Sequence, residues 1–151
     1  MMADKSKIGL QLPPYTFKVE RVKIHEFVQA IGDDNPIFRD KETALSYGYS
    51  DIPCPPTFIT SAFQEFTGAY FKVFKELGVD VKRVLHGEEE YEYLHEIYPG
   101  DILTCNMCVD SIAEKQGKSG KMDLISLRTL LVNQEGEEVL RARSLIIEQK
   151  D

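Results

Sequence analysis

The sequence predicts an α+β domain in which a curved antiparallel sheet wraps around one long central helix. Two stretches of the chain support this prediction. Apolar residues recur at helical intervals from Phe58 to Leu77, and four long strand-like stretches separated by short turns follow from Val84 onward. Sequential strands with tight connections pair as antiparallel neighbours, and a helix that is apolar over most of its surface needs a sheet around it. This arrangement is the hot-dog fold.

Composition limits the classes of partner. A chain of 151 residues with 42% hydrophobic residues can bury one sizeable core without disulfides or metals. A net charge of −7 repels phosphate backbones, so nucleic acid is not an expected partner. Residues 1–10 contain no apolar stretch of signal-peptide length, and no run of about 18 apolar residues occurs. We therefore expect a cytoplasmic protein with no membrane partner.

The N-terminal part of the chain divides at a pair of prolines. Gly9 and Pro13-Pro14 interrupt regular structure, so residues 1–14 are expected to form a flexible arm. Residues 15–151 are expected to form a single hot-dog domain, which begins with a short strand over residues 15–19. No internal repeat divides this domain further.

Two short helices are expected before the long one. Apolar spacing from Val22 to Ile31 predicts a helix that ends at Gly32, and a turn-rich segment follows up to Pro36. Asp40 is expected to cap the second helix, which stops at Gly48.

The long helix is expected over residues 57–77. Its apolar surface is broad and rich in aromatic and small residues, which predicts burial. The four strands that follow are expected at Val84–His95, Ile102–Glu114, Lys121–Asn133 and Glu138–Glu148. Because such a sheet has an open edge and one uncovered face, we expect a homodimer, or a heterodimer with a second hot-dog subunit.

The cysteines do not indicate a metal site. Cys105 and Cys108 lie within one alternating stretch, where residues three apart point to opposite faces of a strand and cannot converge on an ion. With Cys54 they make an odd count, which is typical of free thiols in a reducing compartment. We expect no metal.

Several short motifs occur in an order and spacing that resemble the MaoC-like dehydratases. They are Ala30-Ile-Gly-Asp-Asp-Asn-Pro-Ile-Phe-Arg-Asp40, Gly48-Tyr49, Pro55-Pro-Thr-Phe58, Leu85-His-Gly-Glu-Glu89 and Tyr98-Pro-Gly-Asp101. The resemblance covers about residues 15–148. More specifically, the chain resembles the N-terminal dehydratase branch, which includes the substrate-binding subunits of mycobacterial hydroxyacyl-thioester dehydratases.

The resemblance implies an (R)-specific 3-hydroxyacyl-thioester dehydratase or enoyl-thioester hydratase of fatty acyl metabolism, or a subunit of one. Its substrate would be carried on coenzyme A or acyl carrier protein, and no other cofactor is implied. The family pattern Gly-Asp-x-Asn-Pro-aliphatic-His places the catalytic aspartate on Asp33 and the asparagine on Asn35. The histidine falls on position 38, where this chain has Phe38.

The loss of this histidine leaves three hypotheses, because Phe cannot take part in the acid–base chemistry that His performs near neutrality. The chain is a non-catalytic acyl-thioester-binding partner of a subunit with the complete Asp–His pair, or another histidine replaces the missing one. Among His25, His86 and His95 we favour His86, which stands beside Gly87 at the start of a strand. The third hypothesis is a hot-dog acyl thioesterase.

Further residues are expected to hold the substrate. Backbone N–H groups of Thr57 and Phe58, at the start of the long helix, would bind the thioester carbonyl, although Thr57 fits equally as an ordinary helix cap. Phe38, Phe63 and Phe66 would line the acyl pocket. Arg141 and Arg143 share a strand face and would either offset the negative charge of the carrier or be solvated.

Overall fold

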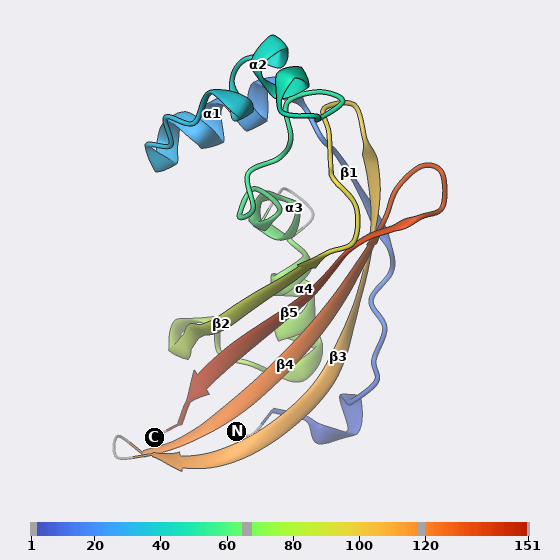
Figure 1. The fold of residues 1–151 in the computed structure, drawn as a ribbon. Helices are drawn as coiled ribbons and strands as arrows, with labels where there is room; N and C mark the ends of the chain where they lie inside the picture. The colour runs from blue at the N-terminus through green and yellow to red at the C-terminus, as the bar shows by residue number, and fades with distance from the viewer. Residues whose placement is uncertain (1–2, 65–67, 118–119, 151) are drawn as a thin grey trace.

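A curved antiparallel sheet dominates the structure (Figure 1). The computed structural model describes residues 3–64, 68–117 and 120–150, and within these residues five strands form one sheet in the order β1-β3-β4-β5-β2. The strands are β1 (Tyr15–Lys18), β2 (Val84–Tyr93), β3 (Ile102–Gly117), β4 (Gly120–Val132) and β5 (Glu138–Gln149). The predicted succession of antiparallel neighbours is confirmed for β3, β4 and β5. The strand β2 instead pairs with β5 at the far side of the sheet.

The first short helix ends, and the second begins, at the residues that the sequence predicts. Helix α1 (Arg21–Ile31) ends at Gly32, whose φ of 69° is left-handed and whose N–H is donated to the carbonyls of Val28 and Gln29. Helix α2 (Lys41–Ser46) is capped by Asp40, whose carboxylate accepts a hydrogen bond from the Thr43 N–H at 2.7 Å. Figure 1 shows α1 and α2 together beyond one end of the sheet.

The prediction of one uninterrupted helix over residues 57–77 is wrong. The structure has α3 (Thr60–Gln64) and α4 (Ala69–Leu77), and α4 is preceded by Gly68 at a φ of 55°. A left-handed residue cannot continue a right-handed helix, and glycine adopts this conformation without a steric penalty. Residues 56–59 form turns, so α3 also begins three residues later than expected. Of the described helices, none is long and apolar enough to cross a membrane.

The two helices nevertheless occupy the place predicted for one. Figure 1 shows α3 and α4 following each other along the same face of the sheet. Their buried side chains belong to one core with the inward residues of β3, β4 and β5. The helical members are Ala62, Phe63, Ala69, Val73, Phe74 and Leu77, and the sheet contributes Leu103, Cys105, Met107, Val109, Ile125, Leu127, Leu131, Leu140, Ala142 and Ile146. The apolar periodicity therefore reports burial correctly across a break in the helix.

The N-terminal arm that we expected to be loose lies against β3. Gly9 donates its N–H to the carbonyl of Val109 at 2.8 Å, and Leu12 donates to Met107 at 3.0 Å. Farther back, the Ala3 N–H donates to the buried carboxylate of Asp123 at 2.6 Å. The bonds of Gly9 and Leu12 continue the pairing that β1 makes with β3, because they give backbone groups of β3 partners beyond the end of β1, whereas the Ala3 bond ties the arm to β4. The boundary at residue 15 stays a prediction.

Candidate substrate-binding site

An apolar pocket of about 530 Å³ lies between α3, α4 and the strand β2. Its volume is within the range of small-molecule sites, which are mostly apolar with a few polar groups. The pocket is lined by Thr60, Phe63, Gly68, Tyr70, Phe71, Phe74, Val81, Val84, His86, Glu89 and Ile146. Two expected residues, His86 and Phe63, are therefore brought to one cavity. Phe66, the third expected acyl-pocket residue, lies outside the described residues.

A bulge in β2 aims two polar side chains at this pocket. The pairing of β2 with β5 shifts by one residue between His86 and Glu88, so that His86 faces Ile146 and Glu89 faces Ser144. Residues three apart on a regular strand point to opposite faces, whereas here both side chains line the same pocket. The bulge favours Gly87, since a Cβ there would crowd the Leu145 carbonyl oxygen at 3.1 Å and Ile147 Cδ1 at 3.0 Å.

His86 and Glu89 belong to a chain of hydrogen bonds along the pocket wall. His86 Nε2 lies 2.7 Å from Glu89 Oε2, and the Ser144 hydroxyl donates to Glu89 Oε1 at 2.8 Å. The Tyr70 hydroxyl lies 2.9 Å from Ser144 Oγ. Because the Ser144 proton is given to Glu89, Tyr70 is the donor in this last bond. Burial raises the pKa of Tyr70 well above its usual value, which keeps its proton in place.

Aromatic side chains form the rest of the wall. Tyr70 stacks on Phe74 with ring centroids 6.1 Å apart and meets Phe63 edge-on at 6.2 Å. Tyr91 approaches Phe63 from β2, and its hydroxyl lies 3.0 Å from Thr60 Oγ1. Burial, followed by the charge of Glu89, raises the pKa of Tyr91 to about 12. Phe71 is 65% exposed, so an apolar side chain lines the open part of the pocket.

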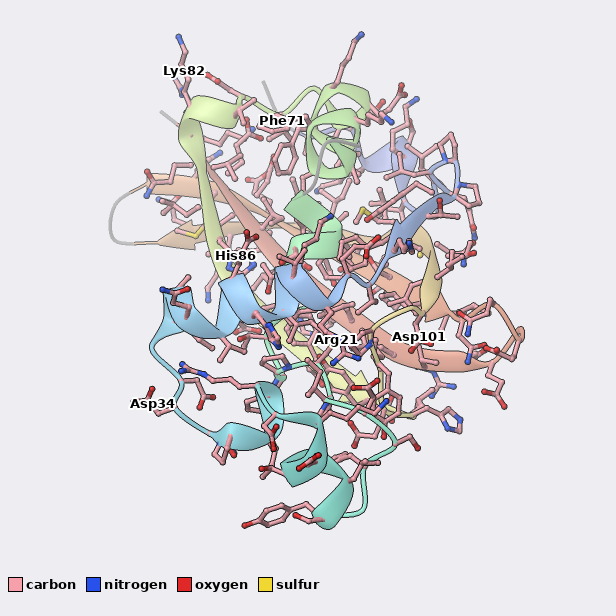
Figure 2. All side chains as sticks on the ribbon, turned by 90° about the horizontal axis from the view of Figure 1, so that it is seen from above. Arg21, Asp34, Phe71, Lys82, His86 and Asp101 are labelled. Carbon is pink, nitrogen blue, oxygen red and sulfur yellow. The ribbon has the colours of Figure 1, made fainter. Side chains whose placement is uncertain are left out.

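The loop that carries Asp33 and Asn35 is separate from this pocket. The Asp33 carboxylate accepts the Asn35 N–H at 2.8 Å, and the Asn35 side chain accepts the Ile37 N–H at 3.2 Å, which caps the turn Pro36–Phe38. Neither residue lines the pocket that contains His86. Figure 2 shows the neighbouring Asp34 pointing outward, across α1 from His86 in this view. Asp33 and Asn35 are thus used by the local turn, and their predicted meeting with His86 is not found.

Phe38 occupies the position of the family histidine and is buried. Its exposed fraction is 8%, and it belongs to the hydrophobic core. It lines a smaller cavity of about 250 Å³ together with Ile37, Tyr49, Pro53, Cys54, Pro56, Tyr93 and Glu96. Phe38 and Phe63 were expected to share one acyl pocket, but they line different cavities.

The expected carbonyl-binding group at Phe58 is also corrected. Its N–H is donated to the Pro55 carbonyl at 2.9 Å, within the turn that precedes α3, so it is not free for a ligand. The cause is the turn itself, because a helix starting at residue 57 would have left this N–H without a partner. The role of the Thr57 N–H stays a prediction.

The two arginines of β5 lie on the outer face of the sheet, away from the pocket. Arg143 pairs with Glu88 and Glu90, and Arg141 pairs with Glu92 and Glu138. These partners could not be predicted from the alternation of the strand alone, and neither could the presence of Glu89, Ser144 and Tyr70 in the pocket. A bulge at Gly87, inferred from that glycine within a strand, would have placed Glu89 beside His86.

Comparisons with known proteins agree with the fold. Residues 6–142 match the family described as FAS1-like, dehydratase domain region. A UPF0336 protein of Streptomyces avermitilis is 33% identical over 148 residues, which are 97% of this chain and 95% of that protein.

Solved structures give the same result. A chain of the HadBC (3R-hydroxyacyl-ACP dehydratase) complex of Mycobacterium tuberculosis superposes with a TM-score of 0.81 at 26% identity, and the match covers 97% of this chain and 99% of that one. A chain of the ChsH1-ChsH2 complex of the same organism gives a TM-score of 0.77 over 97% of this chain and 86% of that one, and its 23% identity supports the fold alone. The hot-dog fold and the resemblance to MaoC-like dehydratases are confirmed, and the chain belongs to the FAS1-like dehydratase domain region family.

Proposed function

We propose that this chain is the acyl-thioester-binding subunit of a two-subunit (R)-3-hydroxyacyl-thioester dehydratase. The observation that carries the proposal is that a buried Phe38 replaces the family histidine while a separate apolar pocket lies beside β2. The chain thus has a place for an acyl group without the usual catalytic pair. A HadBC complex and a ChsH1-ChsH2 complex among its structural neighbours support a second hot-dog subunit as the partner.

The acyl chain would lie against Phe63, Tyr70 and Phe74, whose rings form the apolar wall. Each methylene that leaves water contributes about 0.8 kcal/mol, so even a medium-length chain gains substantial affinity from such a wall. The thioester, carried on coenzyme A or acyl carrier protein, would extend toward the partner. There the partner's Asp and His would remove and return the elements of water.

The partner subunit would extend the sheet by pairing one of its own edge strands with the open edge of β2. Exposed apolar side chains lie near that edge: Phe71 and Val81 line the pocket, and Leu85 is exposed on β2 itself. An unpaired strand edge beside exposed apolar surface is a typical docking site for a further subunit. Covering these residues would also close the pocket to water.

A second candidate function has its own observation. The 2.7 Å contact between His86 and Glu89 places an imidazole with an orienting carboxylate on the wall of an apolar pocket. This is the arrangement that general acid–base catalysis needs, and it would make the chain a self-sufficient hydratase.

One assay separates the two functions. Hydration of octenoyl-coenzyme A is followed by the loss of enoyl absorbance for the chain alone, for a dyad-bearing hot-dog hydratase subunit from the same genome, and for the co-expressed pair. We expect turnover that depends on the pair and is abolished by removing the partner's histidine. In the pair, His86→Asn should change KM but lower kcat by no more than about threefold.

Turnover by the chain alone that is lost in His86→Asn would overturn the proposal in favour of the second candidate. Release of free thiol without hydration would instead indicate a thioesterase.

A further inference from the structure

The outer face of β2 carries a row of three glutamates. Beyond the bulge at Gly87, Glu88, Glu90 and Glu92 occupy alternate positions and face away from the core. Their side chains are 61%, 66% and 60% exposed. We call these three residues the glutamate row.

Among the described residues, only part of the charge of this row is offset. Arg143 lies 3.0 Å from Glu90 and 3.1 Å from Glu88, so one guanidinium serves two carboxylates. Arg141 lies 3.4 Å from Glu92 but 2.7 Å from Glu138. Both arginines are on β5, on the side of β2 that is already paired. Four carboxylates and two guanidinium groups leave an excess of negative charge beside the open edge.

This edge is the longer of the two that end the described sheet. The strand β2 has 10 residues and pairs only with β5, whereas β1 at the opposite end has 4 residues. A subunit that extends the sheet at β2 would therefore place its own edge strand directly beside the glutamate row. Side chains on the same face of neighbouring strands lie about 5 Å apart, close enough for charges to decide the pairing.

A second copy of this chain fits that edge poorly. Two copies that extend one sheet are related by a two-fold axis perpendicular to it, so the outer face of one strand continues the outer face of the other. Each register centred near Glu90 then sets glutamate opposite glutamate, since only residues of the same face stand opposite each other. Like charges directly opposite are destabilising.

We propose that the glutamate row selects a different subunit, one whose edge strand carries lysine or arginine on its outer face, and rejects self-pairing. The inference rests on the proposed function in that it specifies the partner of the two-subunit enzyme. It combines attraction to one partner with repulsion of the competing one, as specific interfaces commonly do. Opposite charges along the interface between the two edge strands would also raise the association rate of the two subunits at low ionic strength.

The test uses the chain and its own variants as partners, so that no natural partner is needed. Sedimentation velocity at low salt measures dimerisation of the wild type, of E88Q/E90Q/E92Q, and of a mixture of the wild type with E88K/E90K/E92K. We expect the Gln variant to self-associate at least about tenfold more tightly than the wild type. The mixture should dimerise more tightly still, and high salt should reduce both differences. Hydrogen exchange of residues 84–93 should slow in the mixed dimer.

The matched control is E26Q/E42Q/E135Q, which makes the same change of net charge at exposed positions away from β2. It should associate as the wild type does. If the wild type self-associates as tightly as the Gln variant, or if the control gains as much, the inference is overturned. If the Lys variant does not fold, the comparison of the wild type with the Gln variant still decides. Association is measured here without any enzymatic readout, so this result is independent of whether the proposed dehydratase activity is found.

Discussion

Two regions of the molecule attract attention for catalysis, and they differ in how their polar groups are used. In the loop from Asp33 to Phe38, the carboxylate and the amide accept backbone N–H groups of the same turn, and the aromatic ring is buried. In the pocket beside β2, the polar chain from Tyr70 through Ser144 and Glu89 to His86 ends on an imidazole that lines an open cavity. The loop keeps most of the family motif, but the groups that could meet a ligand lie in the pocket.

The difference shows that a motif and a site are separate properties of a sequence. Replacing the histidine by Phe38 turns a position for proton transfer into a position for packing, while the turn around it is preserved by Asp33, Asn35 and Pro36. A hot-dog subunit can therefore keep the shape of the motif after losing its chemistry.

The largest expected effect concerns packing in the loop. Phe38→Ala should lower the free energy of unfolding by about 3 kcal/mol, because a buried aromatic ring is removed and a cavity remains. Phe71→Ala, at a ring that is 65% exposed, should cost less than about 0.5 kcal/mol and serves as the matched control. Urea denaturation measures both, and equal effects would contradict a packing role for Phe38.

The next effect concerns the pocket. In the two-subunit enzyme, Phe71→Ala should raise KM for octenoyl thioesters by about tenfold, equivalent to about 1.4 kcal/mol of lost apolar contact. The shorter crotonyl thioester should be affected less than about threefold, because it does not reach the open part of the wall. A uniform loss of kcat for both substrates would count against an acyl-binding role for this pocket.

The third effect concerns the ion pairs of Asp51, which join the loop before α3 to α1 and α2. The Arg21 guanidinium of α1, 2.7 Å away, holds the pKa of Asp51 well below its usual value of 3.8, and hydrogen bonds from the Ile52 N–H at 2.7 Å and from Lys41 of α2 at 3.2 Å add to the effect. A lowered carboxyl pKa stabilises the fold above the unfolded value, and this stability is lost as the pH falls below 3.8. Asp51→Asn should thus lower the free energy of unfolding by about 1 kcal/mol at neutral pH, and by progressively less as the pH falls from 3.8 toward the lowered pKa of the folded state, as denaturation at a series of pH values would show.

The smallest effect is expected at the family aspartate. Asp33→Asn should change the free energy of unfolding by about 0.5 kcal/mol, because an amide oxygen can still accept the Asn35 N–H. The kcat of the two-subunit enzyme should stay within about twofold. A fall in kcat of a hundredfold or more would return Asp33 to the catalytic machinery.

The sequence predicted the fold better than the site. Alternation placed β3, β4 and β5 correctly, and Gly32 and Asp40 marked the ends of helices because their conformations and side chains act locally. The break of the helix at Gly68 was not predicted, since an isolated glycine within a helical pattern of apolar residues is compatible with an unbroken helix.

The pocket could not be predicted in the same way, because its geometry is not encoded in the hydrophobic periodicity of the sequence. The neighbouring Gly87 pointed to His86, but regular alternation places Glu89 on the opposite face, and only the one-residue shift at the bulge brings it to the same pocket. Ser144 and Tyr70 come from distant parts of the chain, and only the folded sheet brings them to Glu89. The Phe58 N–H was assigned to a ligand because the helix was expected to begin too early.

The comparison between the loop and the pocket is tested most directly by asking where an acyl chain lies. An enoyl thioester with a photoreactive diazirine at the end of an eight-carbon chain is irradiated with the co-expressed pair, and the labelled peptides of this subunit are identified by mass spectrometry. The account predicts labels on residues 69–77 of α4 and on 84–89 of β2, competed by unlabelled octenoyl thioester. Labels confined to residues 33–38 would contradict it.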